Sequence, residues 1–178
     1  MTSTGKQMFS PFAHQPTVES PVRIISGGQT GVDRIALDVA LELQIPIGGW
    51  CPKGRRAEDG VIPNRYPLLE TESKKYNTRT KRNIRDSDAT LILSTLPLTG
   101  GTAMTENIAR KREKPFLIVD LNALPDVENV QKWLSENRIA VLNIAGPRAD
   151  SLKELDAIVR IFLRKLFRQV LFLPTPRD

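Results

Sequence analysis

Two glycine-rich turns in the sequence have the composition of an anion-binding site. The first reads Ser26-Gly27-Gly28-Gln29-Thr30-Gly31, and the second reads Thr99-Gly100-Gly101-Thr102. Each stands between an apolar segment and a segment in which apolar residues recur at helical spacing. Glycine lets the backbone turn tightly and expose its N–H groups, and the amino end of a helix adds partial positive charge. Both turns are therefore predicted to accept a phosphate or a similar anion.

The same turns exclude two common nucleotide-binding motifs. The first turn is not GxGxxG, and no Gly-Lys-Ser/Thr follows it. Ordinary P-loop nucleotide hydrolysis is therefore disfavoured. The alternative to an anion site is a tight connection from strand to helix that needs glycine and holds no ligand.

A cluster of cations follows the first turn. Lys53, Arg55 and Arg56 lie within four positions of a polar segment, residues 52–72, which is longer than most loops that join a strand to a helix. These side chains could close over an anionic ligand and steer it from a distance. Residues 53–85 hold ten Lys or Arg and four acids, so the positive charge is concentrated there. Aromatic residues make up only 6% of the chain, which disfavours nucleic acid as the ligand.

Further cations stand on a predicted helix. Lys75, Arg79 and Arg82 are spaced by four and three residues, so they share one helix face. This face could be a solvated surface or a subunit interface, or Arg79 could contribute a phosphate contact.

Metal ligands and catalytic groups are sparse. Cys51 and His14 are the only cysteine and histidine, and together they cannot build a metal site of nitrogen and sulfur ligands. No metal held directly by protein ligands is predicted. The same lack of histidine leaves no Ser-His-Asp triad. We expect a buried Cys51 and a binding protein rather than an enzyme; if the chain is an enzyme, Glu106 and Arg79 are the candidate catalytic residues.

Apolar segments that alternate with helical ones predict an α/β fold. A parallel sheet with continuous apolar strands needs helices on both faces. The fold class is therefore a three-layer, Rossmann-like, doubly wound parallel sheet of at least five strands. Strands are expected over 22–26, 45–50, 89–94, 115–121 and 139–144, and helices over 31–43, 74–86, 102–112, 127–137 and 150–172.

Ligands of open parallel sheets bind beyond the carboxyl ends of the strands, near a switch point in the strand order. If strands 22–26 and 89–94 are neighbours, the two glycine turns flank one crevice. Gly146-Pro147-Arg148 follows the last strand and could add a cation at the rim, or it could be a simple turn.

The length of 178 residues suits one domain, which we place at 21–174 after a flexible leader, residues 1–20. No apolar run is long enough to cross a bilayer, and no secretory signal is visible, so a cytoplasmic location is expected. The final helix carries an apolar stripe and the apolar patch 170–173, which belong to the core or to a subunit interface. The stripe consists of residues 157, 158, 161, 162, 166 and 170.

Five stretches of the chain resemble the molybdenum cofactor carrier proteins, the putative molybdenum carrier family of the SLOG, or lysine-decarboxylase-like, Rossmann superfamily. They cover nearly all of residues 22–150, and the first two are specific. The stretches are IISGGQTGVDRIALDVA (24–40), GGWCPKGRRAEDGVIPNRYPLLET (48–71), YNTRTKRNIRDSDATLIL (76–93), TGGTAMTENIA (99–109) and NIAGPR (143–148).

The resemblance implies a homo-oligomer, a dimer or tetramer, that binds and protects the molybdenum cofactor as cargo. Molybdoenzymes or cofactor-synthesis proteins would be its protein partners. The phosphate of the molybdopterin would bind at one of the glycine turns, and its anionic oxide end at the cations of residues 53–56. The candidate cofactor-binding residues are Gly27, Gly28, Gln29, Thr30, Gly31, Lys53, Arg55, Arg56, Thr99, Gly100, Gly101 and Thr102.

A second branch of the superfamily leaves an alternative open. The cytokinin-activating phosphoribohydrolases carry a PGGxGTxxE-type motif after a strand. Residues 99–106, TGGTAMTE, lack the next glycine of that motif but keep a downstream acid, Glu106. The alternative function is therefore a sensor of a nucleotide or of an ADP-ribose-type ligand, or a nucleoside-monophosphate phosphoribohydrolase.

Overall fold

The structure is a computed structural model that describes residues 23–123, 125–151 and 155–171. The predicted leader, residues 1–20, lies outside the described residues. Five parallel strands form the central sheet, as predicted from the sequence. In spatial order they are β2 (Ile47–Gly48), β1 (Arg23–Ile25), β9 (Val141–Ala145), β7 (Ala89–Ser94) and β8 (Phe116–Asp120).

The strand order corrects one expectation. β1 and β7 are not neighbours, because β9 lies between them and pairs with both. The chain runs outward from β1 to β2 and from β7 to β8, and then it returns from β8 to the centre of the sheet. β9 suits this place because four of its five residues are buried and Asn143 donates to the Thr90 hydroxyl of β7 at 3.1 Å. The loop after β9 is thereby placed between the two glycine turns.

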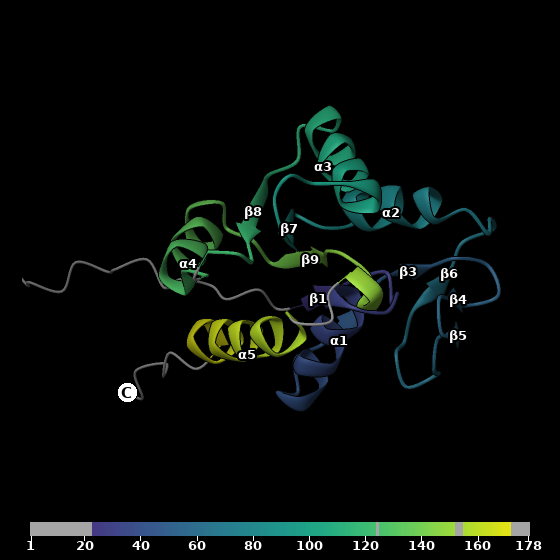
Figure 1. Ribbon diagram of the computed structural model, residues 1–178, viewed down its shortest axis with the longest axis horizontal. Coiled ribbons are helices and arrows are strands. Elements are labelled where there is room, and N and C mark those ends of the chain that lie inside the picture. The colour runs from purple at the N-terminus through teal and green to yellow at the C-terminus, as the bar shows by residue number, and fades with distance from the viewer. Residues whose placement is uncertain (1–22, 124, 152–154, 172–178) are drawn as a thin grey trace, which may run out of the picture.

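The helices cover both faces of the sheet, which confirms the three-layer fold (Figure 1). On one face α1 packs against α5, and α5 also contacts α4; on the other face α2 packs against α3. This division follows from right-handed crossovers, because β1 to β2 and β7 to β8 run in opposite directions across the sheet. The helices are α1 (Val32–Glu42), α2 (Tyr76–Arg85), α3 (Gly100–Lys111), α4 (Val127–Glu136) and α5 (Asp156–Leu171), with a short 3-10 helix at Ala149–Ser151.

The helix α5 buries a different stripe from the predicted one. Val159, Phe162, Leu163, Leu166 and Phe167 are buried against the core. Of the predicted residues, Phe162 and Leu166 belong to this stripe, whereas 157, 158 and 161 are exposed. The buried stripe is set by the position of α1 and α4, which the helix sequence alone does not fix. Side chains of 170–173 lie outside those that the structure describes, and an interface role for the exposed face stays a prediction. No helix among the described residues has the length and apolarity required to cross a membrane.

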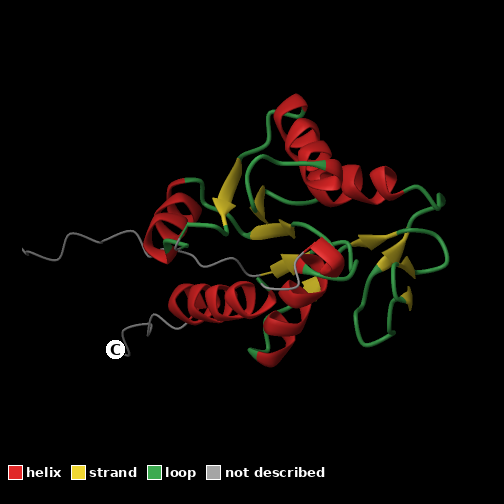
Figure 2. Cartoon of the chain, viewed as in Figure 1, coloured by secondary structure: helices red, strands yellow, loops and turns green. Residues whose placement is uncertain are grey.

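The predicted strand 45–50 is divided at Gly49, whose φ is +126°. A Cβ at Gly49 would overlap the Ser26 carbonyl oxygen, so glycine is needed where the chain leaves the sheet. The chain then enters the polar segment 52–72, which lies beside the sheet and contains short strands (Figure 2). β3 (Trp50–Cys51) pairs with β6 (Leu69–Glu70), and β4 (Arg56–Ala57) forms a hairpin with β5 (Gly60–Val61).

Arg55 holds the polar segment 52–72 together. Its guanidinium donates to the carbonyl oxygens of Ile62, Pro63, Tyr66 and Leu68 at distances from 2.9 to 3.1 Å. A planar fork with five N–H groups suits such a set of carbonyls, whereas a lysine ammonium cannot reproduce it. The Arg55 guanidinium is therefore engaged in hydrogen bonds within the protein, although the cluster of cations in the sequence predicted that it contacts a ligand.

We expect Arg55→Lys to lower the free energy of unfolding by about 2 kcal/mol, because several charge-assisted hydrogen bonds to partly buried carbonyls are lost. Urea denaturation measures this value, and hydrogen exchange should show the largest loss of protection in residues 55–70. The matched control is Lys53→Ala at an exposed position of the same segment, with an expected change within about 0.5 kcal/mol. An Arg55→Lys protein as stable as the unchanged one would show that the carbonyls are satisfied without the guanidinium.

Candidate functional site

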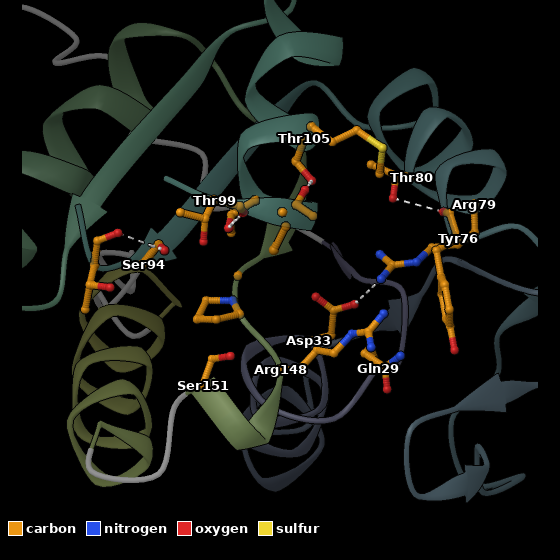
Figure 3. Close-up of a pocket in the computed structure, with 18 residues that line it drawn as sticks. Gln29, Asp33, Tyr76, Arg79, Thr80, Ser94, Thr99, Thr105, Arg148 and Ser151 are labelled. Atoms are coloured by element: carbon orange, nitrogen blue, oxygen red, sulfur yellow. Dashed lines mark hydrogen bonds and ion pairs between the residues drawn. The ribbon is translucent and has the colours of Figure 1, made fainter. Parts of the chain in front are cut away.

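A polar cavity of about 380 Å³ lies at the carboxyl ends of β1, β9 and β7 (Figure 3). Such a volume lies in the range of pockets for small ligands. The loop after β1 and the start of α1 contribute Gln29 and Asp33, and α2 contributes Tyr76, Arg79 and Thr80. The remaining walls come from the loops after β7 and β9 and from the first turns of α3. The walls are rich in hydroxyl groups, from Tyr76, Thr80, Ser94, Thr95, Thr99, Thr102, Thr105 and Ser151.

An ion pair forms the floor of the cavity. Arg79 Nη2 lies 3.1 Å from Asp33 Oδ2, and only 14% and 3% of the two side chains are exposed. Burial raises the pKa of the Asp33 carboxyl, although the charge of Arg79 and the nearby backbone N–H groups of Gln29 and Gly27 act in the opposite direction. The chain therefore already places a carboxylate of its own beside the first glycine turn.

Gln29 presents an oriented donor at this floor. Its Oε1 accepts from the N–H groups of Thr30, at 2.9 Å, and Glu58, at 2.8 Å. Two N–H donors at the oxygen fix the orientation of the amide, because its NH₂ group could not accept from them. Gln29 Nε2, Arg79 Nε and Asp33 Oδ2 have no hydrogen-bond partner among the described residues, although all three atoms are buried. Buried donors without a partner are rare, which marks this floor as a place where a polar group is recognised.

The amino end of α3 forms another wall and exposes N–H groups. The first N–H groups of a helix have no partner within the helix. The Thr102 and Ala103 N–H groups donate to the Thr99 carbonyl, and the hydroxyls of Thr102 and Thr105 donate to carbonyls of the same turn. The backbone N–H groups of Gly100 and Gly101 are therefore the free donors at this end among the described residues. A Cβ at Gly101 would meet no protein atom within 4 Å, and its φ is not in the left-handed region. Neither packing nor backbone geometry therefore requires glycine there, whereas close approach of a ligand would.

Two guanidinium groups lie near Tyr76 at the rim. The Arg148 guanidinium lies 5.0 Å from the centre of the Tyr76 ring, and that of Arg56 lies 5.9 Å from it. Arg148 Nη1 is also 3.9 Å from Glu58 Oε1, and Glu58 accepts from the Thr30 hydroxyl at 2.7 Å. The rim thus combines cations with one acid, and Arg148, which is half exposed, lines the cavity directly.

The structure brings only part of the predicted binding residues to the cavity. Those that line it are Gln29, Thr99, Gly100, Gly101 and Thr102. Those that do not are Gly27, Gly28, Thr30, Gly31, Lys53, Arg55 and Arg56.

The glycines of the first turn have roles within the fold. A Cβ at Gly27 would overlap the Arg79 guanidinium, and one at Gly28 would overlap Leu68. Gly31 has a φ of +80° and lies against the backbone of Pro147 and Arg148. These glycines therefore position the cavity walls without lining the cavity.

Sequence reasoning missed several wall residues. Asp33 stands in the first turn of the helix after the first glycine turn, which is the signal that could have identified a carboxylate facing the N–H groups of that turn. Tyr76, Thr80 and Thr105 carry no signal of their own, because their place depends on how α2 and α3 pack. Arg148 was expected only at the rim, and the central position of β9 makes it a wall residue.

Only one of the two residues named for a possible enzyme lines the cavity. Arg79 lines the cavity, whereas Glu106 does not and instead accepts from Arg110 at 2.8 Å. Cys51 is fully buried, as predicted, and burial raises the pKa of its thiol. Among the residues that the structure describes, no group of three or more His, Cys, Asp or Glu could hold a metal ion.

The sheet and the polar cavity at its carboxyl edge define an α/β protein of the Rossmann-like type. The sequence profile of the circularly permutated YpsA SLOG family matches residues 24–167, and the chain belongs to this family. The superfamily inferred from the motifs is thereby confirmed.

A solved structure supports the same assignment. The crystal structure of a protein from Syntrophus aciditrophicus, named "Putative molybdenum carrier protein", superposes with a TM-score of 0.78 at 44% sequence identity. The match covers 84% of this chain and 96% of the other one. A comparison with curated proteins returned no match.

Proposed function

We propose that this protein is a carrier of the molybdenum cofactor, which it binds as cargo, shields and passes on without chemical change. The name of the Syntrophus protein and the family membership support the molybdenum part. The polar cavity with its cations and open N–H groups supports the anionic part, since both the terminal phosphate and the oxide end of the cofactor are anionic. Hydrogen bonds and charges hold the cargo in this proposal, and protein side chains do not ligate molybdenum.

The observation that carries the proposal is the free amino end of α3. Gly101 leaves open space beside the free N–H groups of Gly100 and Gly101, which line the cavity, and such helix ends are ready-made sites for phosphate. We place the phosphate there, at Gly100–Thr102. The first glycine turn is the weaker candidate, because only Gln29 of its predicted binding residues lines the cavity and Asp33 places a carboxylate beside it.

The oxide end of the cofactor is placed at the rim. Arg148 lines the cavity, and Arg56 adjoins it across Tyr76. Two guanidinium groups near one aromatic ring present hydrogen-bond donors and positive charge to oxide ligands. Of the three cations named from the sequence, Arg56 keeps this role, whereas Arg55 is engaged with backbone carbonyls.

Replacing Gly101 by valine tests the phosphate position. We expect the variant to lose at least about tenfold in affinity for molybdopterin, because the side chain fills the space that the phosphate needs, which corresponds to about 1.4 kcal/mol or more. Titration of the protein with molybdopterin, followed by pterin fluorescence, measures the affinity. A purified sample should also be analysed by mass spectrometry with molybdenum quantified.

The matched control is Asn107→Val, which places a valine at an exposed position of the same helix. This variant should bind like the unchanged protein, and both variants should melt within a few degrees of it. If Gly101→Val binds molybdopterin normally, the phosphate does not lie at α3. If the unchanged protein binds no pterin and holds a nucleotide instead, the sensor or phosphoribohydrolase alternative replaces the carrier.

Three features of the carrier stay predictions of the sequence. They are the assembly into a dimer or tetramer, the cytoplasmic location, and delivery to molybdoenzymes or receipt from cofactor-synthesis proteins. Sedimentation of the loaded and empty protein measures the first.

A further inference from the structure

The floor of the cavity contains a feature that opposes anion binding. Asp33 is an acid in the wall of a pocket proposed for an anionic cargo, and it is paired with Arg79, a cation that such a cargo would otherwise use. The pair is buried, so solvent screens it weakly. As long as the pair is closed, the floor contributes little net positive charge.

Neither partner of the pair is fully satisfied by hydrogen bonds. Asp33 Oδ2 and Arg79 Nε are buried and have no hydrogen-bond partner among the described residues, although Arg79 Nη2 lies 3.1 Å from Asp33 Oδ2. The pair is therefore held chiefly by the opposite charges of its two members, and an anion that offers acceptors to Arg79 competes with Asp33 for the guanidinium.

Gly27 provides the space that Arg79 occupies. A Cβ at this position would overlap three atoms of the guanidinium, and its φ is not in the left-handed region. Backbone conformation therefore does not require glycine here. Glycine is required because the Arg79 guanidinium occupies the space that a Cβ would fill. The guanidinium is the far end of a flexible side chain, so it has other positions within reach of the cavity that it lines.

We propose that Asp33 is a positioning residue that sets the affinity of the cavity for oxyanions by holding Arg79 at the floor. An oxyanion that binds in the cavity takes Arg79 from Asp33, and the buried carboxyl that is left behind takes up a proton. The inference rests on the proposed function only in that the cavity receives an anion. It adds that uptake of the anion is coupled to uptake of a proton, so the affinity rises as the pH falls.

The charged and titratable groups around the pair are few. Tyr76 and Arg148 line the cavity with it, and Glu58 faces Arg148 at the rim. The buried Cys51 thiol is affected by the charge of Arg79 from the side of β3. Histidine is the side chain that ordinarily changes charge between pH 5 and 8, and His14 lies outside the described residues, so the measurement is made in a His14→Gln background.

Sulfate is the probe, since it stays a dianion from weakly acidic to neutral pH and any pH dependence then belongs to the protein. Calorimetric titration in two buffers of different ionisation enthalpy counts the protons taken up on binding. With Asp33 intact, we expect about one proton per sulfate and an affinity that rises as the pH falls. Asp33→Asn should bind sulfate about tenfold more tightly at neutral pH, without pH dependence and without proton uptake, because Arg79 is free from the start.

Two further variants separate positioning from folding. Gly27→Ala displaces the guanidinium without changing any charge, and it should also strengthen sulfate binding at neutral pH. Glu72→Gln is the matched control. Glu72 forms an ion pair with Arg82, which follows Arg79 by one turn of α2, and neither Glu72 nor Arg82 lines the cavity. It should leave the affinity, its pH dependence and the proton count unchanged.

The outcomes decide between the possibilities. If sulfate binds with no proton uptake and Asp33→Asn has the affinity of the unchanged protein, Asp33 is only structural and the proposal is overturned. If neither protein binds sulfate at any pH, Arg79 is not available to oxyanions and the proposal also fails. Both results are independent of the molybdopterin titration. A protein that binds molybdopterin but shows no proton uptake with sulfate is a carrier without this coupling. A protein that shows the coupling with sulfate but does not bind molybdopterin has a pocket for another anion.

Discussion

Arg79→Met is expected to lower the free energy of unfolding by about 3–5 kcal/mol at neutral pH, since it leaves the buried Asp33 carboxylate without its counter-charge. Methionine keeps much of the volume of the side chain, so a cavity contributes little to the loss. Denaturant unfolding of both proteins measures the difference.

The loss should depend on pH in a defined direction. Burial already raises the pKa of Asp33 in the folded protein, and removal of Arg79, which acts to lower it, raises it further. A carboxyl with a raised pKa in the folded state contributes stability below its unfolded pKa, and the contribution is lost as the pH rises through the folded value. The deficit of Arg79→Met relative to the unchanged protein should therefore shrink in acid and grow toward neutral pH.

Two controls accompany this prediction. Arg82→Met removes a more exposed arginine of the same helix, whose ion pair with Glu72 is on the surface, and should cost no more than about 1 kcal/mol. Combining Arg79→Met with Asp33→Asn should remove the pH dependence of the deficit. If both variants lost the same free energy of unfolding, breaking the buried Arg79–Asp33 pair would cost no more than breaking the surface pair of Arg82 and Glu72.

Gly31→Ala is expected to lower the free energy of unfolding by about 2–5 kcal/mol and to weaken ligand binding as well. Gly31 has φ 80° and ψ −138°, a backbone conformation that favours glycine, which accounts for about 1–2 kcal/mol. A Cβ there would also overlap the Pro147 carbonyl oxygen and lie 2.6 Å from the Arg148 carbonyl carbon. These are backbone atoms that cannot rotate away, so overpacking adds about 1–3 kcal/mol.

The expected loss of ligand binding follows from the same contact. A side chain at Gly31 would displace the loop 147–149, and this loop holds Arg148 in the cavity wall. Gly54→Ala is the matched control, because Gly54 has a φ of +79° but no protein atom lies within 4 Å of its Cβ position. It should cost only about 1 kcal/mol and leave ligand affinity unchanged. Similar losses of stability in the two variants would assign the effect to backbone conformation alone.

Much of the fold follows from local sequence patterns. The five strands and the first four helices were predicted within about two residues of their observed bounds, because apolar runs and helical spacing are local properties. The last helix was predicted to begin at residue 150, which is wrong, because 149–151 form a 3-10 helix and α5 begins at Asp156. The glycine turn before α3 was also predicted as an anion site from its own composition, and the structure places it in the cavity wall. The polar segment 52–72 was recognised as an excursion, but its short strands were not, since two-residue pairings leave almost no pattern.

The sequence by itself determined that this is a Rossmann-like protein of the SLOG superfamily with glycine turns at strand ends. Only the tertiary structure decided which of those turns lines the cavity. Strand order depends on contacts between distant segments, so the place of β9, and with it the role of Arg148, has no local signature. Likewise, Asp33 pairs with Arg79 beside the first turn and Arg79 fills the space at Gly27, because packing brings α1 and α2 to the same floor. Arg55 shows the same limit, since its partners are backbone carbonyls that the chain gathers only on folding.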